Sequence, residues 1–102
     1  MENVITGTKD NLDTLITGGK TTIIDFWAEW CGPCRALGPI LDKLAEENPS
    51  IQVIKVNVDE NIELSMKYSI RSIPAVFIYK NGEQVDKFVG VKSKEDIAKL
   101  IQ

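Results

Sequence analysis

The stretch FWAEWCGPCRALGPI, residues 26–40, contains both cysteines of this 102-residue chain, Cys31 and Cys34. It overlaps a run of β-branched and aromatic residues, KTTIIDFWAEW at 20–30, which is typical of a strand buried on both faces. From residue 33 to about residue 48, apolar side chains recur at helical spacing. We therefore expect the two thiols at the junction between a buried strand and a helix.

The flanking sequence alternates between strand and helix patterns. The expected elements are a short edge strand at 3–5, a helix in 8–16, a second buried strand in 51–59 and a short helix in 61–70. In the last of these, Ile62, Met66 and Ile70 recur four residues apart, as in a helix. This alternation favours an α/β fold.

The C-terminal third predicts a hairpin and a final helix. Asn81-Gly82 separates AVFIYK from EQVDKFVG, which is the signal of a tight primed turn. In SKEDIAKLI, Ser93 is the expected N-cap and Asp96 has the position of a capping-box acid. The order β-α-β-α-β-α-β-β-α predicts one domain, residues 1–102, with a mixed sheet and helices on both faces.

Composition excludes several classes of function. The net charge is −3 without a cluster of Lys or Arg, so neither nucleic acid nor an anionic membrane surface is an expected ligand. Histidine is absent, which excludes Ser-His and Cys-His nucleophiles and histidine-ligated metals. The N-terminal residues lack the pattern of a signal peptide and no stretch is long and apolar enough to span a membrane, which favours the cytosol.

Four interpretations of Cys31-Gly32-Pro33-Cys34 can be compared. A structural staple would gain only about 2 kcal/mol from so short a loop, against about 4.7 kcal/mol for a loop of about 100 residues. A zinc site would need carboxylates to complete its four ligands, because the chain has no other Cys and no His. Unreactive free thiols leave the spacing unexplained. A redox pair at a strand-to-helix junction accounts for the spacing and the flanking elements.

The redox interpretation gives each residue of the motif a part. A sulfur at the helix entrance faces free backbone N–H groups and the positive end of the helix dipole, so Cys31 is the expected thiolate nucleophile. Cys34, one turn further, is the expected shielded, resolving thiol. Pro33 fits a first helical turn, and Gly32 allows another chain to approach closely.

The chain resembles the thioredoxin family over essentially its whole length. The resemblance rests on DFWAEWCGPC, on the later IRSIPA, and on KNGE followed by VG. It implies the thioredoxin fold, a central mixed five-stranded β-sheet flanked by four α-helices. It also implies a monomeric, cytoplasmic protein-disulfide reductase that uses the redox-active disulfide and no other cofactor. The implied partners are an NADPH-dependent flavoprotein, thioredoxin reductase, and client disulfides such as those of reductases and peroxidases.

Two charges interrupt the apolar strands, Asp25 in TTIIDFW and Lys55 in QVIKVNV. One interpretation is a structural ion pair between neighbouring strands, because an unpaired buried ion is costly. The other is proton transfer, because Asp25 lies six residues before Cys31 and a buried carboxylate of raised pKa suits a base that deprotonates Cys34. The resemblance implies the proton-transfer role for both residues and leaves the ion pair open.

Pro74 begins the apolar run AVFIYK, and by sequence alone it is a proline at a strand start with an ordinary trans bond. The resemblance implies instead a cis Ile73-Pro74 bond lying against the cysteines, with the backbone of Ile73 free to pair with an extended substrate segment. The residues expected to form an apolar docking patch are Trp30, Gly32, Pro33, Ile73, Pro74, Val89 and Gly90. Trp27 is expected in the core, and Gly38-Pro39 is expected to be structural.

Two rival functions remain open. A disulfide oxidase or isomerase could use the same fold, although Gly-Pro between the cysteines and the lack of a signal peptide argue against it. A binding subunit could use the apolar patch with incidental thiols.

Overall fold

The computed structural model describes residues 2–102 and contains every element that the sequence predicts, in the predicted order. The elements are β1 (Val4–Thr6), α1 (Leu12–Thr17), β2 (Thr22–Trp27), α2 (Gly32–Glu47), β3 (Gln52–Asn57), α3 (Ile62–Lys67), β4 (Ala75–Lys80), β5 (Glu83–Val89) and α4 (Lys94–Leu100). None of the described helices is long and apolar enough to cross a bilayer.

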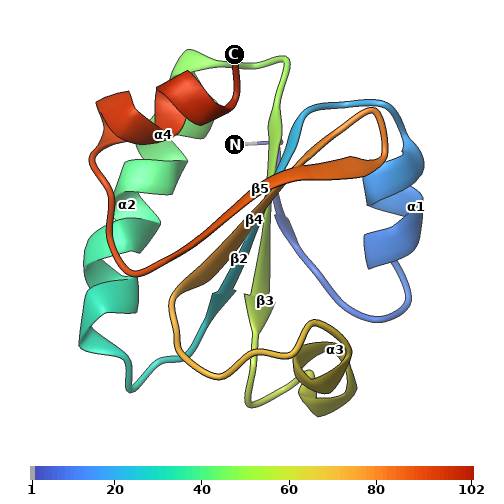
Figure 1. Ribbon diagram of the computed structural model, residues 1–102, viewed down its shortest axis with the longest axis vertical. Coiled ribbons are helices and arrows are strands. Elements are labelled where there is room, and N and C mark those ends of the chain that lie inside the picture. The colour runs from blue at the N-terminus through green and yellow to red at the C-terminus, as the bar shows by residue number, and fades with distance from the viewer. Residues whose placement is uncertain (1) are drawn as a thin grey trace.

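The strands form one mixed sheet in the order β1-β3-β2-β4-β5. β1, β3 and β2 run parallel, whereas β4 and β5 are antiparallel to their neighbours. Helices α2 and α4 cover one face of the sheet, and α1 and α3 cover the other (Figure 1). The predicted mixed sheet between two helical layers is confirmed.

Alternation along the central strands supplies a separate core to each face. Ile23 of β2 and Val53 of β3 pack with α2 and α4, whereas their neighbours Ile24 and Ile54 pack with α1 and α3. Asp25 and Lys55 have the same parity as Ile23 and Val53, so they lie on the sheet face that α2 covers. The strand pattern therefore directs both charges toward the helix that follows the cysteines.

The hairpin between β4 and β5 has the predicted primed turn. Asn81 has φ 54° and Gly82 has φ 81°, and positive φ at both central residues matches the twist of the flanking strands. The ladder pairs Lys80 with Glu83 and shifts register between Ile78 and Tyr79, where β4 and β5 form a bulge or irregularity.

The orientation of α3 differs from what its most regular spacing suggests. Ile62 and Met66 recur four apart, yet they are 65% and 74% exposed, whereas Leu64 between them is 5% exposed. Leu64 and Tyr68 also lie four apart, and both pack against the core on the α1 side of the sheet. The sequence thus places apolar residues on two opposite sides of one short helix, Ile62 and Met66 on one and Leu64 and Tyr68 on the other. Contact with the aromatic core decides which side is buried.

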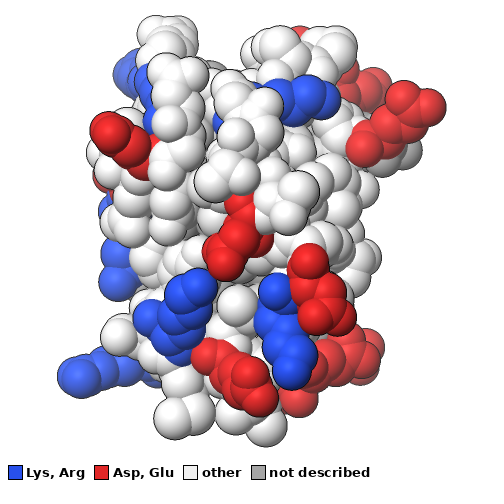
Figure 2. All heavy atoms as spheres, turned by 90° about the vertical axis from the view of Figure 1, so that its right-hand side faces the viewer, with Lys and Arg blue, Asp and Glu red and all other residues white. Residues whose placement is uncertain are grey.

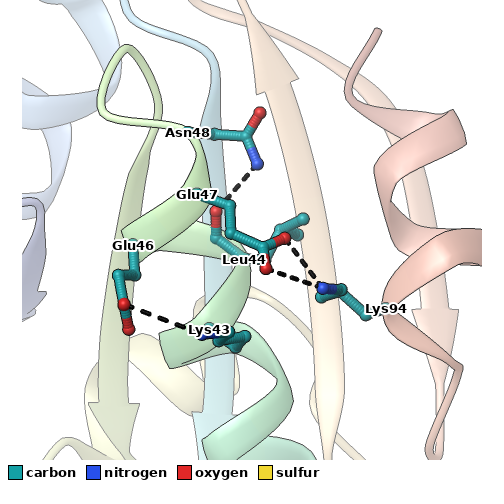
Figure 3. Close-up of polar contacts among 6 residues, drawn as sticks. All are labelled: Lys43, Leu44, Glu46, Glu47, Asn48 and Lys94. Atoms are coloured by element: carbon teal, nitrogen blue, oxygen red, sulfur yellow. Dashed lines mark hydrogen bonds and ion pairs between the residues drawn. The ribbon is translucent and has the colours of Figure 1, made fainter.

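The C-terminal end of α2 is fastened to the rest of the molecule. The Lys94 ammonium at the start of α4 bonds to both carboxylate oxygens of Glu47 at 2.8 Å, and the Asn48 side chain donates to the Leu44 carbonyl at 2.8 Å (Figure 3). The Asn3 amide donates to the Ala45 carbonyl at 2.8 Å. The contacts with Lys94 and Asn3 tie this end of α2 to α4 and to the residue before β1, whereas the Asn48 contact caps the helix itself.

The surface over α1 and α3 carries interspersed charges of both signs (Figure 2). Lys9 faces Glu63 at 3.8 Å, and Lys67 faces Asp13 at 3.7 Å. All four side chains are at least 60% exposed, so each pair contributes little to stability.

Candidate redox site

The two cysteines lie where β2 gives way to α2, as the sequence predicts. Cys31 is the N-cap of α2, Cys34 lies in its first turn, and the two are joined as a disulfide with their Cα atoms 5.3 Å apart. That separation lies within the usual range for disulfides. The sequence predicts that Cys34 is the shielded thiol. Cys34 is indeed only 5% exposed, but Cys31 is 4% exposed, so shielding from solvent does not distinguish the two residues.

Hydrogen bonding to the helix does distinguish the two sulfurs. Cys31 has an extended backbone, and its Sγ accepts the N–H of Cys34 at 3.2 Å, as N-cap side chains do. In the reduced protein this donor and the helix dipole would both favour a thiolate at Cys31. Gly32 and Pro33 form the start of the helix, where a missing N–H costs nothing.

A loop before β4 closes over the sulfur of Cys31. The Ile73-Pro74 peptide bond is cis, as the family resemblance implies. The general preference of X-Pro bonds for the trans form would not have predicted this. The Ile73 carbonyl oxygen lies 3.7 Å from Cys31 Sγ. Pro74 accepts a hydrogen bond from the Gly90 N–H at 2.9 Å, and Gly90 has φ +94°, a conformation that favours glycine. This bond joins the two loops expected to border the site.

The surface around the cysteines is partly apolar and exposed. Trp30 is 68% exposed and its indole N–H donates to Asp59 Oδ2 at 2.9 Å, while Val89 is 55% exposed. Gly32 and Pro33 are exposed, and Ile73 and Gly90 are half-buried. An open pocket of about 460 Å³ lies between Trp30 and Ile73 and is also lined by Val58 and Ile70. Pro74 is the exception among the expected patch residues, since it is buried and supports the surface from below.

Asp25 is buried on the α2 side of β2. It is 2% exposed, and its Oδ1 has no hydrogen-bond partner among residues 2–102. Burial raises the pKa of Asp25 to about 7, against the lowering effect of Lys55 and with a smaller raising effect of Asp42. A carboxyl group with this pKa can accept and release a proton near neutral pH.

Lys55 stands opposite Asp25 in the register of β2 and β3, yet the direct ion pair considered from the sequence is not formed. The Lys55 ammonium lies instead 2.6 Å from Asp42 Oδ1 of α2, an ion pair in which this oxygen accepts no hydrogen bond from the described residues. The helix supplies a carboxylate that is more exposed than Asp25, so pairing there leaves less buried charge than pairing with Asp25 would.

A pocket of about 220 Å³ connects these groups to Cys34. It is lined by Asp25, Trp27, Cys34, Arg35, Gly38, Pro39, Asp42 and Lys55. Sequence analysis missed Asp42 and gave Gly38-Pro39 no part in the site. Helical spacing could have found them, because Cys34, Gly38 and Asp42 recur four residues apart on one face of α2.

Two further residues have settings that the sequence did not predict. Trp27 is half-buried and packs against the cysteines, rather than lying wholly in the core. Asp59 accepts the indole N–H of Trp30 from the turn that follows β3, a contact that joins residues 29 positions apart in the chain. Within residues 2–102, no three Cys, Asp or Glu side chains group in a way that could hold a metal ion.

Comparison with known proteins identifies the arrangement. The sequence model of the thioredoxin family matches residues 3–102. The chain is 45% identical to a thioredoxin of Chlamydia pneumoniae over 90% of this chain and 89% of that protein, and 39% identical to one of Staphylococcus saprophyticus over 97% and 95%. A mutant thioredoxin from Halobacterium salinarum superposes with a TM-score of 0.90 at 33% identity, covering 98% of this chain and 88% of that one. The chain belongs to the thioredoxin family, and with its Cys31–Cys34 pair it is a protein-disulfide oxidoreductase.

Proposed function

We propose that the chain is a general protein-disulfide reductase in which Cys31 attacks and Cys34 resolves. The Cys31 thiolate attacks one sulfur of a substrate disulfide, forms a mixed disulfide and releases the first substrate thiolate. Cys34 then loses its proton and attacks Cys31 Sγ, which closes the Cys31–Cys34 disulfide and releases the second substrate thiol. Two electrons pass to the substrate without a bound cofactor. The observation that carries the assignment is that Cys31, as N-cap, accepts a helix N–H that Cys34 donates.

Asp25 takes the proton of Cys34 in this scheme, with Lys55 modulating it. The support is the shared pocket, since Asp25, Cys34 and Lys55 line the same space of about 220 Å³. Proton transfer needs a base whose pKa lies near the working pH, and burial gives Asp25 a pKa of about 7. The proton can cross the pocket directly or through one water molecule.

The apolar surface around Cys31 docks client proteins. Trp30 and Val89 offer exposed apolar side chains, and the open pocket beside Ile73 can take a side chain of the substrate. An extended segment could pair with the backbone of Ile73, which precedes the first ladder pair of β4, Ala75 with Val89. Gly32, Pro33, Pro74 and Gly90 shape the floor of this surface.

Turnover requires a source of electrons. The family implies that an NADPH-dependent flavoprotein, thioredoxin reductase, regenerates the dithiol and that clients include reductases and peroxidases. The chain would act as a monomeric single domain in the cytoplasm, where a reducing environment keeps the pair in its active dithiol form.

The test is the equilibrium redox potential of the Cys31–Cys34 pair, measured against dithiothreitol and glutathione buffers with tryptophan fluorescence as the readout. A reductase requires a value well below about −180 mV, the region of protein disulfide isomerase. A value at or above that region would assign the chain to disulfide formation or isomerisation instead. A low potential with no reduction of protein disulfides would favour a binding subunit.

A further inference from the structure

The ion pair between Lys55 and Asp42 lies at the wall of the pocket that joins Asp25 to Cys34. The ammonium and carboxylate are 2.6 Å apart, and the side chains are 23% and 39% exposed. Both residues line the pocket together with Asp25. The pair is therefore partly shielded from solvent and close enough to influence any proton held at Asp25.

Three elements confine the Lys55 ammonium to this wall. Lys55 lies on β3 beside Asp25 of β2, on the sheet face covered by α2. Gly38 of α2 passes close above it, since a Cβ atom at that position would lie 3.8 Å from Lys55 Nζ. Two carboxylates line this space, Asp25 and Asp42. The Oδ1 atom of each lacks a hydrogen-bond partner among the described residues, and what distinguishes Asp42 is its ion pair with Lys55.

The other groups that face Asp25 do not offer an alternative counter-ion within the sheet. Its neighbour across β4 is Val76, which is apolar and fully buried. From α2 the pocket is lined by Cys34, Arg35 and Asp42, and from β3 by Lys55. Arg35 is exposed, so its charge is screened more strongly than that of Lys55.

We propose that Asp42 is a positioning residue that holds the Lys55 ammonium away from Asp25, so that the Asp25 carboxylate remains a strong enough base to take the proton of Cys34. If Lys55 paired with Asp25 instead, it would stabilise the carboxylate and weaken it as a base. The proton released by Cys34 as it attacks Cys31 would then have a poorer acceptor. This inference rests on the proton-transfer role proposed above for Asp25.

Replacing Asp42 by Asn removes the anchor while keeping the size of the side chain. Lys55 then turns toward Asp25, the one buried carboxylate left in the pocket. We expect the titration of Asp25, followed by the ¹³C shift of its carboxyl carbon, to move to lower pH by about half a unit to one unit, less than the one to three units of direct contact. Glu46→Gln is the matched control, because it removes one negative charge from α2 at a surface pair with Lys43 and should leave the titration unchanged.

A double-mutant cycle separates positioning from simple repulsion between two carboxylates. In a Lys55→Met background, Asp42→Asn should move the Asp25 titration by less than half of its shift in the parent protein, because there is no ammonium left to reposition. An equal shift in both backgrounds, no shift, or a shift to higher pH in the parent would overturn the proposal.

Kinetics distinguishes this inference from the proton-transfer role itself. Stopped-flow absorbance after mixing the dithiol form with 5,5′-dithiobis(2-nitrobenzoate) resolves the second thionitrobenzoate release, which reports the attack by Cys34. The rate of this second release is measured as a function of pH. In Asp42→Asn the rise of the rate on the acid side should move to lower pH together with the carboxyl titration, and the maximal rate should fall roughly two- to threefold, as expected for a weaker base. If the carboxyl titration shifts and the rate profile does not, Asp42 positions Lys55 but Asp25 is not the base.

Discussion

Lys55 and Asp25 are direct partners in the register of β2 and β3, yet the ammonium of Lys55 forms its ion pair with Asp42 and none with Asp25 among the described residues. Burial therefore dominates the acidity of Asp25 and raises its pKa to about 7. A carboxyl group whose pKa is raised on folding stabilises the protein at low pH, and this stabilisation is lost as pH rises toward the folded-state value.

We predict that Asp25→Asn gains stability relative to the parent protein as pH rises. Between pH 4 and pH 9 the gain should reach up to roughly 4 kcal/mol, because about three pKa units correspond to 1.36 kcal/mol each. Urea unfolding of the oxidised proteins at several pH values measures it, since the disulfide removes thiol titration. Glu29→Gln, at an exposed carboxylate, should differ from the parent by less than about 0.5 kcal/mol throughout. A pH-independent difference for Asp25→Asn would contradict the assignment.

We predict that Leu64→Ala destabilises the protein by about 2 to 3 kcal/mol, whereas Met66→Ala changes its stability by less than about 0.5 kcal/mol. The two residues share one helix, but Leu64 is 5% exposed and Met66 is 74% exposed. Equilibrium unfolding in guanidinium chloride gives both values. The reverse ranking would mean that α3 presents its other side to the core.

We predict that Cys34→Ser stops turnover and traps substrates as mixed disulfides on Cys31. The helix N–H that Cys31 Sγ accepts comes from residue 34 and survives the substitution, so Cys31 keeps its activation. Non-reducing electrophoresis and peptide mass mapping identify the trapped species. The matched variant Cys31→Ser should trap far less, because Cys34 lies inside the helix and its sulfur lacks this donor; equal trapping would refute the assigned order of attack.

We predict that Val89→Asp raises KM for protein disulfides about tenfold and leaves the reduction of a small disulfide nearly unchanged. A charge at this position would have to be desolvated beneath a docked protein but would hardly affect a small substrate. Val85→Asp is the matched control, since Val85 lies on the same strand with 50% exposure against 55% for Val89. Similar losses in both variants would show that binding does not depend on the surface beside the cysteines.

The element order was predictable because each element carries a strong local signal. The β-branched run before Cys31, the Asn81-Gly82 turn and the Ser93 cap all act within a few residues, and all three appear where the sequence places them. The cis bond at Pro74 followed from the family resemblance alone, because the local preference of proline favours trans.

The partner of Lys55 and the buried side of α3 were not predictable in this way. Asp42 and Lys55 are brought together only when α2 packs across β3, and Leu64 prevails over Met66 only through contact with the aromatic core. Asp59 likewise reaches Trp30 only in the folded chain. These features depend on how elements pack. Spacing within α2 indicates that Asp42 shares a face with Cys34, but it does not encode which residue of another element meets that face.

The register shift between Ile78 and Tyr79 helps to protect the edge of the sheet from pairing with a strand of another molecule. The sheet ends in β1, only three residues long, and in β5, whose ladder with β4 is irregular and which carries Glu83, Asp86 and Lys87. Short, bulged or charged edge strands are poor templates for another strand. The sheet can therefore offer an apolar surface beside its cysteines without inviting edge-to-edge aggregation.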